Sequence, residues 1–379
     1  MNNTLLIVGA SARAAAFSAL RAGLYPWCVD LFADVDLQRR CPVLRPTESY
    51  PDGFQCFLNG DLSGPWMYAG GLENWPCLVE RWARLRSLWG NDARALSLVR
   101  DPAHVASLFR AASMPVPNLA ERTLPDTRRW LLKPRWGAGG TGVRFWTLGE
   151  DIPPNGDYYV QEYIEGQSLA LLYLGDGRTA RLLGATRQLV GEPWLHAAPF
   201  QYCGSIGPLD PSIVERPSLD ELGRLLASEC GLQGLFGVDG ILRDGLFYPV
   251  EINPRYTASV EVLEYATGLS MLQSHAHVFT HVRLPPITPI TPIRHIIGKA
   301  ILFARADLHF PSHGPWMKEF DSPKSVHEMP AFADIPSAGE RIESGKPILT
   351  FFTAADSPSS CEDGLRQIAA DLDRWLFQR

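Results

Sequence analysis

The stretch Gly237-Val-Asp-Gly-Ile-Leu-Arg-Asp-Gly-Leu-Phe-Tyr-Pro-Val-Glu-Ile-Asn-Pro-Arg255 predicts two strands joined by a tight turn. Apolar residues run on both sides of Asp244-Gly245, a dipeptide typical of two-residue β-hairpin turns. Such a hairpin brings Asp239, on its first strand, alongside Glu251 on its second. The spacing therefore predicts two carboxylates side by side in an antiparallel sheet.

The second strand adds further ligands on the same face. Glu251 and Asn253 are two residues apart, so their side chains leave one face while Ile252 points into the core. With Asp239 they offer two carboxylates and one amide oxygen, a set that suits Mg²⁺ with a phosphate substrate better than zinc, which prefers Cys and His. Arg255 adds a cation for a phosphate or carboxylate. A polar hairpin rim, with carboxylates paired to arginines, stays open as the alternative.

A glycine-rich loop lies upstream, in Trp130-Leu-Leu-Lys-Pro-Arg-Trp-Gly-Ala-Gly-Gly-Thr-Gly-Val-Arg144. A strand carrying Lys133 enters the loop, and glycines there let backbone N–H groups approach an anion. Lysine is scarce in this chain, which favours a phosphate-binding role for Lys133 over a flexible hairpin loop. The pattern matches neither a Walker loop nor GxGxxG. The loop glycines are Gly137, Gly139, Gly140 and Gly142.

A third segment, Tyr158-Tyr-Val-Gln-Glu-Tyr-Ile-Glu-Gly166, predicts a strand that ends at Glu-Gly. In this order and spacing, the three segments resemble the ATP-grasp superfamily of carboxylate–amine and carboxylate–thiol ligases. The resemblance implies that Lys133 and the loop bind the phosphates of ATP. It assigns adenine to a hinge near residues 161–166, through Gln161, Glu162 and Ile164. It also implies metal ligands and a phosphoryl-steadying arginine, namely Asp239, Glu251, Asn253 and Arg255.

Shorter phrases resemble one branch of that superfamily, the predicted ATP-dependent carboligases related to the tyramine–glutamate ligases of methanofuran synthesis. They include Gly9-Ala-Ser-Ala-Arg13, Gly184-Ala-Thr-Arg-Gln-Leu-Val-Gly191 and Asn253-Pro-Arg-Tyr-Thr-Ala-Ser259. This resemblance implies amide formation through an acyl phosphate, with release of ADP and phosphate, in a pterin- or methanofuran-type C1 cofactor pathway. The cofactors implied are ATP and Mg²⁺ or Mn²⁺, the partners are a small carboxylate and an amine, and a homodimer is left open. Arg187 would be a further phosphate contact, or else a surface strand arginine.

Two positions depart from the superfamily pattern. Where an early phosphate-binding lysine is common, the chain reads Arg100-Asp-Pro102, so either Arg100 substitutes or the α-phosphate is held less firmly. Where a ribose-binding glutamate is common, the chain has Ser168. A non-catalytic ATP-binding module therefore stays open, as does a biotin-carboxylase-like carboxylation.

The N-terminal segment predicts an α/β fold. A strand at Thr4–Val8, a helix at Ala12–Ala22 and a strand at Pro26–Asp30 form a βαβ unit, which implies a parallel sheet covered by helices. Acidic residues follow this sheet, but without GxGxxG we favour a structural or substrate-side role for them over NAD binding, and a dinucleotide oxidoreductase is the least favoured function. These residues are Asp30, Asp34 and Asp36.

The expected architecture is an ATP-grasp fold in three parts. Residues 1–94 form a Rossmann-like domain, 95–290 the ATP-grasp domain, and 291–379 a small β-rich cap with a terminal helix at Cys361–Phe377. Residues 92–112 and Arg216–Cys230 are predicted to be helical. A proline-rich linker is expected at Leu284–Pro292.

Composition limits the function classes. A net charge of −6 over 379 residues disfavours a nucleic-acid surface. Apolar runs are too short for a membrane span, and no signal peptide is predicted. Seven cysteines without a C-x-x-C pair indicate a reducing cytoplasm.

Overall fold

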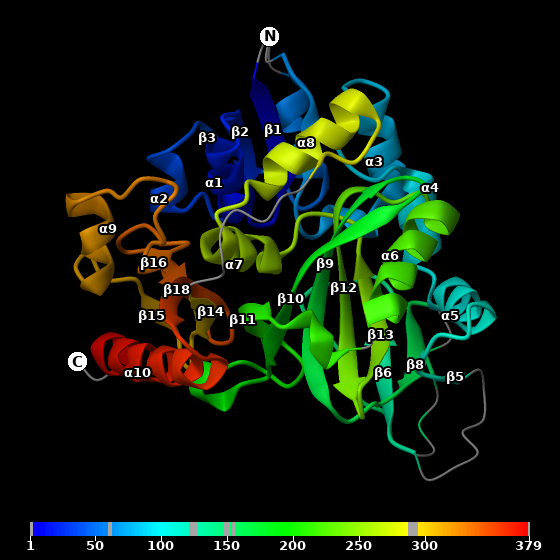
Figure 1. Cartoon of the computed structure of the whole chain (residues 1–379). Helices are drawn as coiled ribbons and strands as arrows, with labels where there is room; N and C mark the ends of the chain where they lie inside the picture. The colour runs from blue at the N-terminus through cyan, green and yellow to red at the C-terminus, as the bar shows by residue number, and fades with distance from the viewer. Residues whose placement is uncertain are drawn as a thin grey trace.

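The computed structural model describes residues 3–59, 63–120, 128–147, 150, 152–153, 156–214, 216–286 and 295–377. Its strands form an N-terminal parallel sheet, a small antiparallel sheet and an eight-stranded antiparallel sheet, with one further strand pair (Figure 1). The α/β class expected from the sequence is confirmed. Within the described ranges, no helix is both long enough and apolar enough to cross a membrane.

The N-terminal sheet has the order β3-β2-β1-β4, and all its pairings are parallel. Alternate residues of β1 point to opposite faces, and Leu5 and Ile7 pack with α1 while Leu6 and Val8 pack with α3. Helices therefore cover both faces, as the βαβ pattern predicts. The elements are β1 (Thr4–Gly9), α1 (Arg13–Arg21), β2 (Tyr25–Asp30), α2 (Val35–Gln38), β3 (Val43–Leu44), η1 (Asp52–Asn59), β4 (Trp66–Tyr68), η2 (Leu72–Asn74) and α3 (Pro76–Ala83).

The helical stretch expected at 92–112 is two helices, α4 (Ala93–Val99) and α5 (Pro102–Ala111). Asp101 caps α5 by accepting a hydrogen bond from the backbone N–H of Ala103. Pro102 occupies the first turn, where its missing N–H costs no hydrogen bond. Arg100 is the C-cap residue of α4, directly before this break, and this position becomes important in the site below.

The small sheet has the order β5-β8-β6-β7 and carries the glycine-rich loop between β6 and β7. Trp130, Leu132 and Val160 form its own apolar cluster. The sheet is therefore a separate layer beside the central sheet (Figure 1). Its strands are β5 (Leu119–Ala120), β6 (Trp130–Pro134), β7 (Arg144–Phe145) and β8 (Tyr158–Glu162).

The central sheet has the order β13-β12-β9-β10-β11-β14-β18-β16. Helix α6 packs on one face against Leu171 and Tyr173, whereas α7 and α8 pack on the other against Leu172 and Leu174. The helix predicted at Arg216–Cys230 is confirmed as α6. The remaining elements here are β9 (Gln167–Asp176), β10 (Ala180–Val190), η3 (Pro193–Leu195), β11 (Tyr202–Leu209), η4 (Pro211–Ile213), β12 (Gln233–Arg243), β13 (Leu246–Asn253), α7 (Ala258–Thr267) and α8 (Met271–His281).

The C-terminal segment is β-rich and ends in a helix, as expected, but its strands β14, β18 and β16 extend the central sheet. The reason is the pairing of β14 with β11, which joins this segment to the preceding one edge to edge. Most of the predicted linker, residues 287–292, lies outside the described residues. The elements are β14 (Ile296–Phe303), β15 (Leu308–His309), η5 (Pro315–Met317), α9 (Lys318–Asp321), β16 (Phe332–Ala333), β17 (Arg341–Ile342), β18 (Pro347–Ala355) and α10 (Pro358–Phe377).

Candidate active site

The hairpin β12–β13 has the predicted register, with Asp239 opposite Glu251. Its turn residues Asp244 and Gly245 have φ angles of 52° and 78°, the positive values that a two-residue hairpin turn requires. Ile252 is buried in the core, so Glu251 and Asn253 share the other face. The juxtaposition of the three side chains is confirmed, and their role as metal ligands stays a prediction.

Asp239 is a partly buried carboxylate held by amides. The Nδ2 of Asn253 donates to its Oδ2 at 2.8 Å, and the side chain of Gln188 also hydrogen-bonds it. Burial, followed by repulsion from Glu251, raises the pKa of Asp239 to about 7, although Gln188, Arg255 and Asn253 oppose the rise. Two crowded carboxylates create a position that a bound cation would stabilise.

The donor set fits Mg²⁺ or Mn²⁺ bound with a phosphate substrate. Such ions are held by one or two carboxylates plus substrate oxygens. The described residues contain no group of three or more His, Cys, Asp or Glu that could hold a metal by themselves. Asp239, Glu251 and Asn253 therefore suit an ion that shares its ligands with a nucleotide.

Arg255 borders the same cavity and is fixed by a side chain from the N-terminal segment. Its Nε donates to Glu73 at 2.6 Å, its NH1 to the carbonyl oxygen of Tyr256 at 3.1 Å, and its NH2 to Oδ1 of Asn253 at 3.0 Å. Burial would lower the pKa of this guanidinium, but Glu73 raises it, so Arg255 stays charged.

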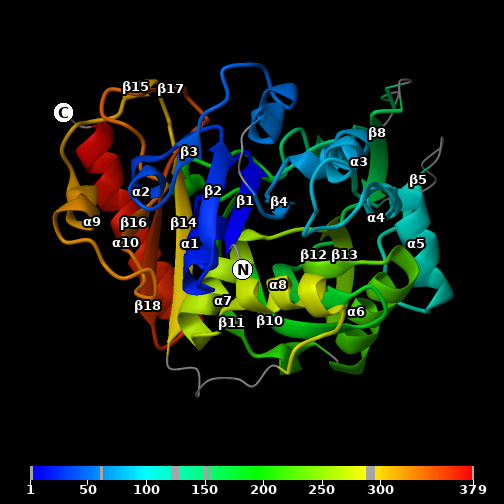
Figure 2. The same cartoon turned by 90° about the horizontal axis from the view of Figure 1, so that it is seen from above.

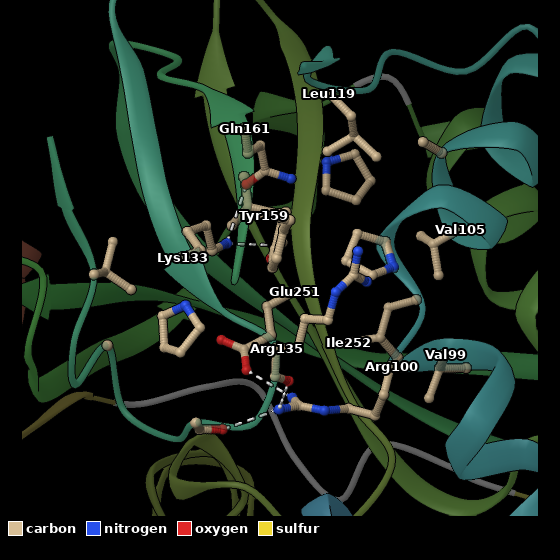
Figure 3. Close-up of a pocket in the computed structure, with 18 of the residues that line it drawn as sticks. Val99, Arg100, Val105, Leu119, Lys133, Arg135, Tyr159, Gln161, Glu251 and Ile252 are labelled. Atoms are coloured by element: carbon tan, nitrogen blue, oxygen red, sulfur yellow. Dashed lines mark hydrogen bonds and ion pairs between the residues drawn. The ribbon is translucent and has the colours of Figure 1, made fainter. Parts of the chain in front are cut away.

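Arg100, at the end of α4, also contacts the hairpin. Its NH1 donates to Oε1 of Glu251 at 3.1 Å (Figure 3). Its NH2 donates to Oδ1 of Asn74 at 2.6 Å. The same NH2 reaches the carbonyl oxygens of Arg135 and Gly137, each at 3.0 Å. The buried Nε of Arg100 has no hydrogen-bond partner in the described part of the chain.

Lys133 projects from β6 towards β8 and β13. Its Nζ donates to Oε1 of Gln161 at 3.0 Å and to the carbonyl oxygen of Val250 at 3.1 Å (Figure 3). It also lies 5.6 Å from the centre of the Tyr159 ring. An ammonium has three N–H donors, so one remains for a phosphate.

The glycine-rich loop contacts the start of strand β11 in the central sheet. The N–H of Tyr202 donates to the carbonyl oxygen of Gly139 at 3.0 Å. Gly140 has a φ of 79°, and a Cβ placed on it would lie 1.8 Å from the carbonyl oxygen of Phe200. Only glycine fits this contact, because any side chain would collide with the backbone opposite.

A cavity of about 490 Å³ lies between the small sheet and the hairpin. It joins the predicted hinge to the predicted metal position in one space. Ile164 and Ser168 lie at the hinge end of its lining, and the carboxylate of Glu162 accepts hydrogen bonds from N and Nδ2 of Asn118. The predicted residues that line it are Lys133, Gly139, Gly140, Gln161, Glu162, Ile164, Asp239, Glu251, Asn253 and Arg255.

A second, smaller cavity of about 80 Å³ opens beside the first. Lys133, Gln161 and Glu251 line both cavities, and Arg100 lines this one (Figure 3). Gly137 borders it too, at the start of the glycine-rich loop. Gly142 lies further along that loop with a φ of 80° and does not line either of these two cavities.

Arg187, like Gly142, is a predicted site residue that does not line either of these two cavities. Its guanidinium pairs with Glu362 of α10, whereas the next residue, Gln188, lines the cavity. Neighbouring residues of a strand point to opposite faces, so only one of the two can face the site. Arg187 does not line this cavity, and its role as a phosphate contact stays a prediction.

Sequence reasoning missed Glu73, Asn74 and Gln188. Gln188 would have been found if the alternation of faces along this strand had been set one residue later, with Gln188 and not Arg187 facing the site. Glu73 and Asn74 follow an apolar, glycine-containing stretch, Tyr68-Ala-Gly-Gly-Leu72, far from the other motifs. Nothing in that short phrase indicates which arginines the fold brings to it.

The fold and the site together define the class. Residues 99–259 match the family model of the ATP-grasp domain, so the chain contains an ATP-grasp domain. That range includes Lys133, the glycine-rich loop and the hairpin β12–β13.

Particular relatives are distant in sequence. The 3-methyl-D-ornithine–L-lysine ligase of Methanosarcina barkeri is 23% identical over 191 residues, which are 50% of this chain and 48% of that protein. The chain thus spans about half the length of this curated relative.

Solved structures match over nearly the whole chain. The biotin carboxylase domain of 2-oxoglutarate carboxylase from Hydrogenobacter thermophilus has a TM-score of 0.69 at 15% identity, covering 96% of this chain and 89% of that one. N5-carboxyaminoimidazole ribonucleotide synthetase from Thermus thermophilus has a TM-score of 0.66 at 15% identity, covering 98% of each chain. At these identities the likeness shows a shared ATP-grasp fold.

Proposed function

We propose that this protein is an ATP-dependent carboxylate–amine ligase that forms an amide through an acyl phosphate. The observation that carries the proposal is the single cavity in which Lys133, the glycine-rich loop and the set Asp239, Glu251 and Asn253 meet. The ATP-grasp match and the relative named as an ornithine–lysine ligase support it.

The proposed chemistry needs positioning and charge more than a side-chain nucleophile. A carboxylate oxygen of the first substrate attacks the γ-phosphorus of ATP, and ADP leaves. An amine then attacks the acyl carbon of the acyl phosphate, and inorganic phosphate leaves as the amide forms. When bound at Asp239, Glu251 and Asn253, Mg²⁺ or Mn²⁺ supplies neutralisation of phosphate charge.

The chain's own residues have separate tasks in this proposal. Lys133 and Arg255 bind oxygens of the phosphates, and Arg100 adds a cation beside Glu251. Gln161, Glu162 and Ile164 border the base. The glycine-rich loop, held by the contacts of Gly139 and Gly140, excludes water from the acyl phosphate. The loss of the expected lysine at Pro102 is then compensated by Arg100.

The test is release of phosphate from Mg-ATP against a panel of carboxylic acids and amines, with ADP and AMP resolved. ADP that appears only with one acid and one amine together supports the ligase and names its substrates. Nucleotide binding without turnover for every pair would instead support a non-catalytic ATP-grasp module.

A biotin-carboxylase-like reaction is the second candidate, because solved biotin carboxylase domains match over almost the entire chain. One of these structures holds MgADP and bicarbonate. ATP cleavage that depends on bicarbonate and on no amine would favour this candidate over the ligase.

Assembly, domain division and pathway belong to the same proposal. A homodimer is suggested by the biotin carboxylase domain that was solved as a dimer, and light scattering during gel filtration tests it. The divisions 1–94, 95–290 and 291–379 are proposed units, although the last two share one sheet. A pterin- or methanofuran-type pathway stays a prediction from the sequence resemblance.

A further inference from the structure

Glu73 is a fully buried carboxylate that the proposed reaction does not use directly. It lies in η2, on the turn that follows β4 of the N-terminal sheet. Its Oε2 accepts from the backbone N–H of Gly71 at 2.6 Å, and its Oε1 accepts from Nε of Arg255 at 2.6 Å. A backbone contact fixes one oxygen, so the other is aimed at Arg255.

The contact with Glu73 determines how Arg255 can face the cavity. A guanidinium has five N–H donors in a planar fork. Three of the N–H groups of Arg255 donate to Glu73, Tyr256 and Asn253. Among the described residues, the other two N–H groups make no such hydrogen bond and are left for a ligand. Rotation of the fork would lose all three contacts together.

The same chain of contacts continues to the predicted metal ligands. Arg255 donates to Oδ1 of Asn253, and Nδ2 of Asn253 donates to Asp239. These two partners determine which end of the Asn253 amide carries oxygen towards Arg255. The orientation of Asn253 and Asp239 therefore depends on Glu73 through Arg255.

The next residue, Asn74, holds Arg100 by a hydrogen bond in the same way that Glu73 holds Arg255. Its Oδ1 accepts from NH2 of Arg100 at 2.6 Å, and its Nδ2 donates to the carbonyl oxygen of Gly137 at 3.4 Å. Arg100 in turn donates to Glu251. One short turn thus contacts two guanidinium groups, of which one pairs with Glu251 and the other with Asn253.

We infer that the Glu73-Asn74 turn positions the metal–nucleotide site, with Glu73 acting through Arg255 on Asn253 and Asp239. The inference rests on the proposed function, because it takes those two residues as metal ligands. Partners that orient metal ligands by hydrogen bonding commonly change metal affinity by about 10- to 100-fold when they are removed. Glu73 is a positioning residue in this scheme, since it touches neither nucleotide nor metal.

The experiment measures Mn²⁺ binding to the full chain in the presence of ATP by electron paramagnetic resonance. Glu73→Gln should weaken Mn²⁺ binding by about 10- to 100-fold and alter the spectrum of the bound ion. Glu80→Gln is the matched control, because Glu80 is an exposed acid of the same segment that pairs only with Arg84 in the described residues. The Mn²⁺ affinity of this variant should equal that of the wild type.

A double-mutant cycle with Arg255→Lys shows whether Glu73 acts through Arg255. Arg255→Lys keeps the charge but removes the Nε–H that contacts Glu73. In that background, Glu73→Gln should cause little further loss of Mn²⁺ affinity, because the coupled contact is already gone. An equal loss in both backgrounds, or no loss in the wild-type background, would overturn the inference.

A wild-type protein that binds no Mn²⁺ with ATP would instead refute the metal site of the proposed function. If Glu73→Gln fails to fold, Asn74→Ala tests the other half of the turn. It should weaken Mn²⁺–ATP binding by about tenfold through release of Arg100. Unchanged binding by a folded Asn74→Ala protein would then reject the turn as a positioning element.

Discussion

Gly140 lies where the glycine-rich loop contacts the segment before strand β11. A substitution at this position tests whether that contact is needed for activity. Gly140→Ala would place a Cβ 1.8 Å from the carbonyl oxygen of Phe200 and should prevent the loop from docking. We expect amide formation to fall at least about tenfold relative to phosphate release, because water then hydrolyses the acyl phosphate before the amine attacks it. Steady-state assays with the substrates found by the panel measure this effect.

Gly139→Ala is the control for that prediction. Gly139 also has a positive φ, 62°, but a Cβ there would meet nothing within 4 Å. Both variants carry the backbone cost of a left-handed alanine, and only one carries the collision. Equal activities of the two variants would contradict the role of the docked loop.

Glu251 links Arg100 to the predicted metal position. Glu251→Gln replaces a negatively charged ligand of the predicted metal ion by a neutral amide. Turnover should fall at least about a hundredfold, because the amide binds a divalent cation much more weakly than a carboxylate does. The side chain is partly exposed, so the fold should persist. Phosphate release and circular dichroism together check this, and near-normal turnover by a folded variant would rule out the metal assignment.

The packing of α8 on β12 depends on one buried histidine. The N–H of Leu235 donates to Nδ1 of His275 at 2.9 Å, which leaves Nε2 to donate to the carbonyl oxygen of Trp89 at 3.1 Å. Burial lowers the pKa of His275 to about 4, although the contact with Trp89 opposes this. The folded protein therefore holds the neutral ring.

The pH dependence of stability follows from that lowered pKa. Above the unfolded value of about 6.5, both states are neutral at this position and the full stability is present. As pH falls from about 6.5 to 4, the unfolded state binds a proton that the folded state refuses, so stability falls by up to about 3 kcal/mol. Urea denaturation across this range should show the slope.

His275→Gln removes the titration of this ring. The difference in pH-dependent stability between the variant and the wild type then separates the effect of His275 from that of the buried aspartates, which both proteins share. The variant should lose less stability than wild type between about pH 6.5 and 4. His313→Gln, at an exposed position, should follow the wild type. Identical slopes for His275→Gln and wild type would show that the ring is not held neutral.

Across the whole molecule, one buried arginine joins three distant segments. Arg13 of α1 donates to Asp334, beside β16, with Nε at 2.9 Å, and to Glu261 of α7 with NH2 at 3.0 Å. Lys299 of β14 also donates to Glu261 at 2.8 Å. Figure 2 shows α1 lying beside α7 and the C-terminal strands. Arg13 and Lys299 hold the pKa of Glu261 well below its usual range, despite burial that would raise it.

Arg13→Met should destabilise the protein by about 3–5 kcal/mol, because it removes one of the two cations from the fully buried Glu261 and leaves the partly buried Asp334 without its cation. Denaturation midpoints measure the loss. The matched control is Arg84→Met, which removes an exposed ion pair and should cost no more than about 1 kcal/mol. Comparable midpoints for the two variants would mean that the Arg13 network contributes little stability.

Local patterns were sufficient to predict the parts of this protein that depend on neighbouring residues. The hairpin register follows from Asp244-Gly245 and strand alternation, and the βαβ opening follows from apolar periodicity. The helix α6 follows in the same way from its leucine spacing. These features need only short-range steric and hydrophobic effects, so they are readable in the chain.

Contacts between distant segments were decided by the tertiary structure. Asp30 shows this, because its Oδ1 accepts from the backbone N–H groups of Phe32 and Ala33, whereas its Oδ2 accepts from that of Ala12, far back in the chain. Arg187 faces α10 because a one-residue strand phase determines its side, and Glu73 meets Arg255 across 182 positions. Pairings over such separations depend on how whole layers pack, which no local pattern encodes.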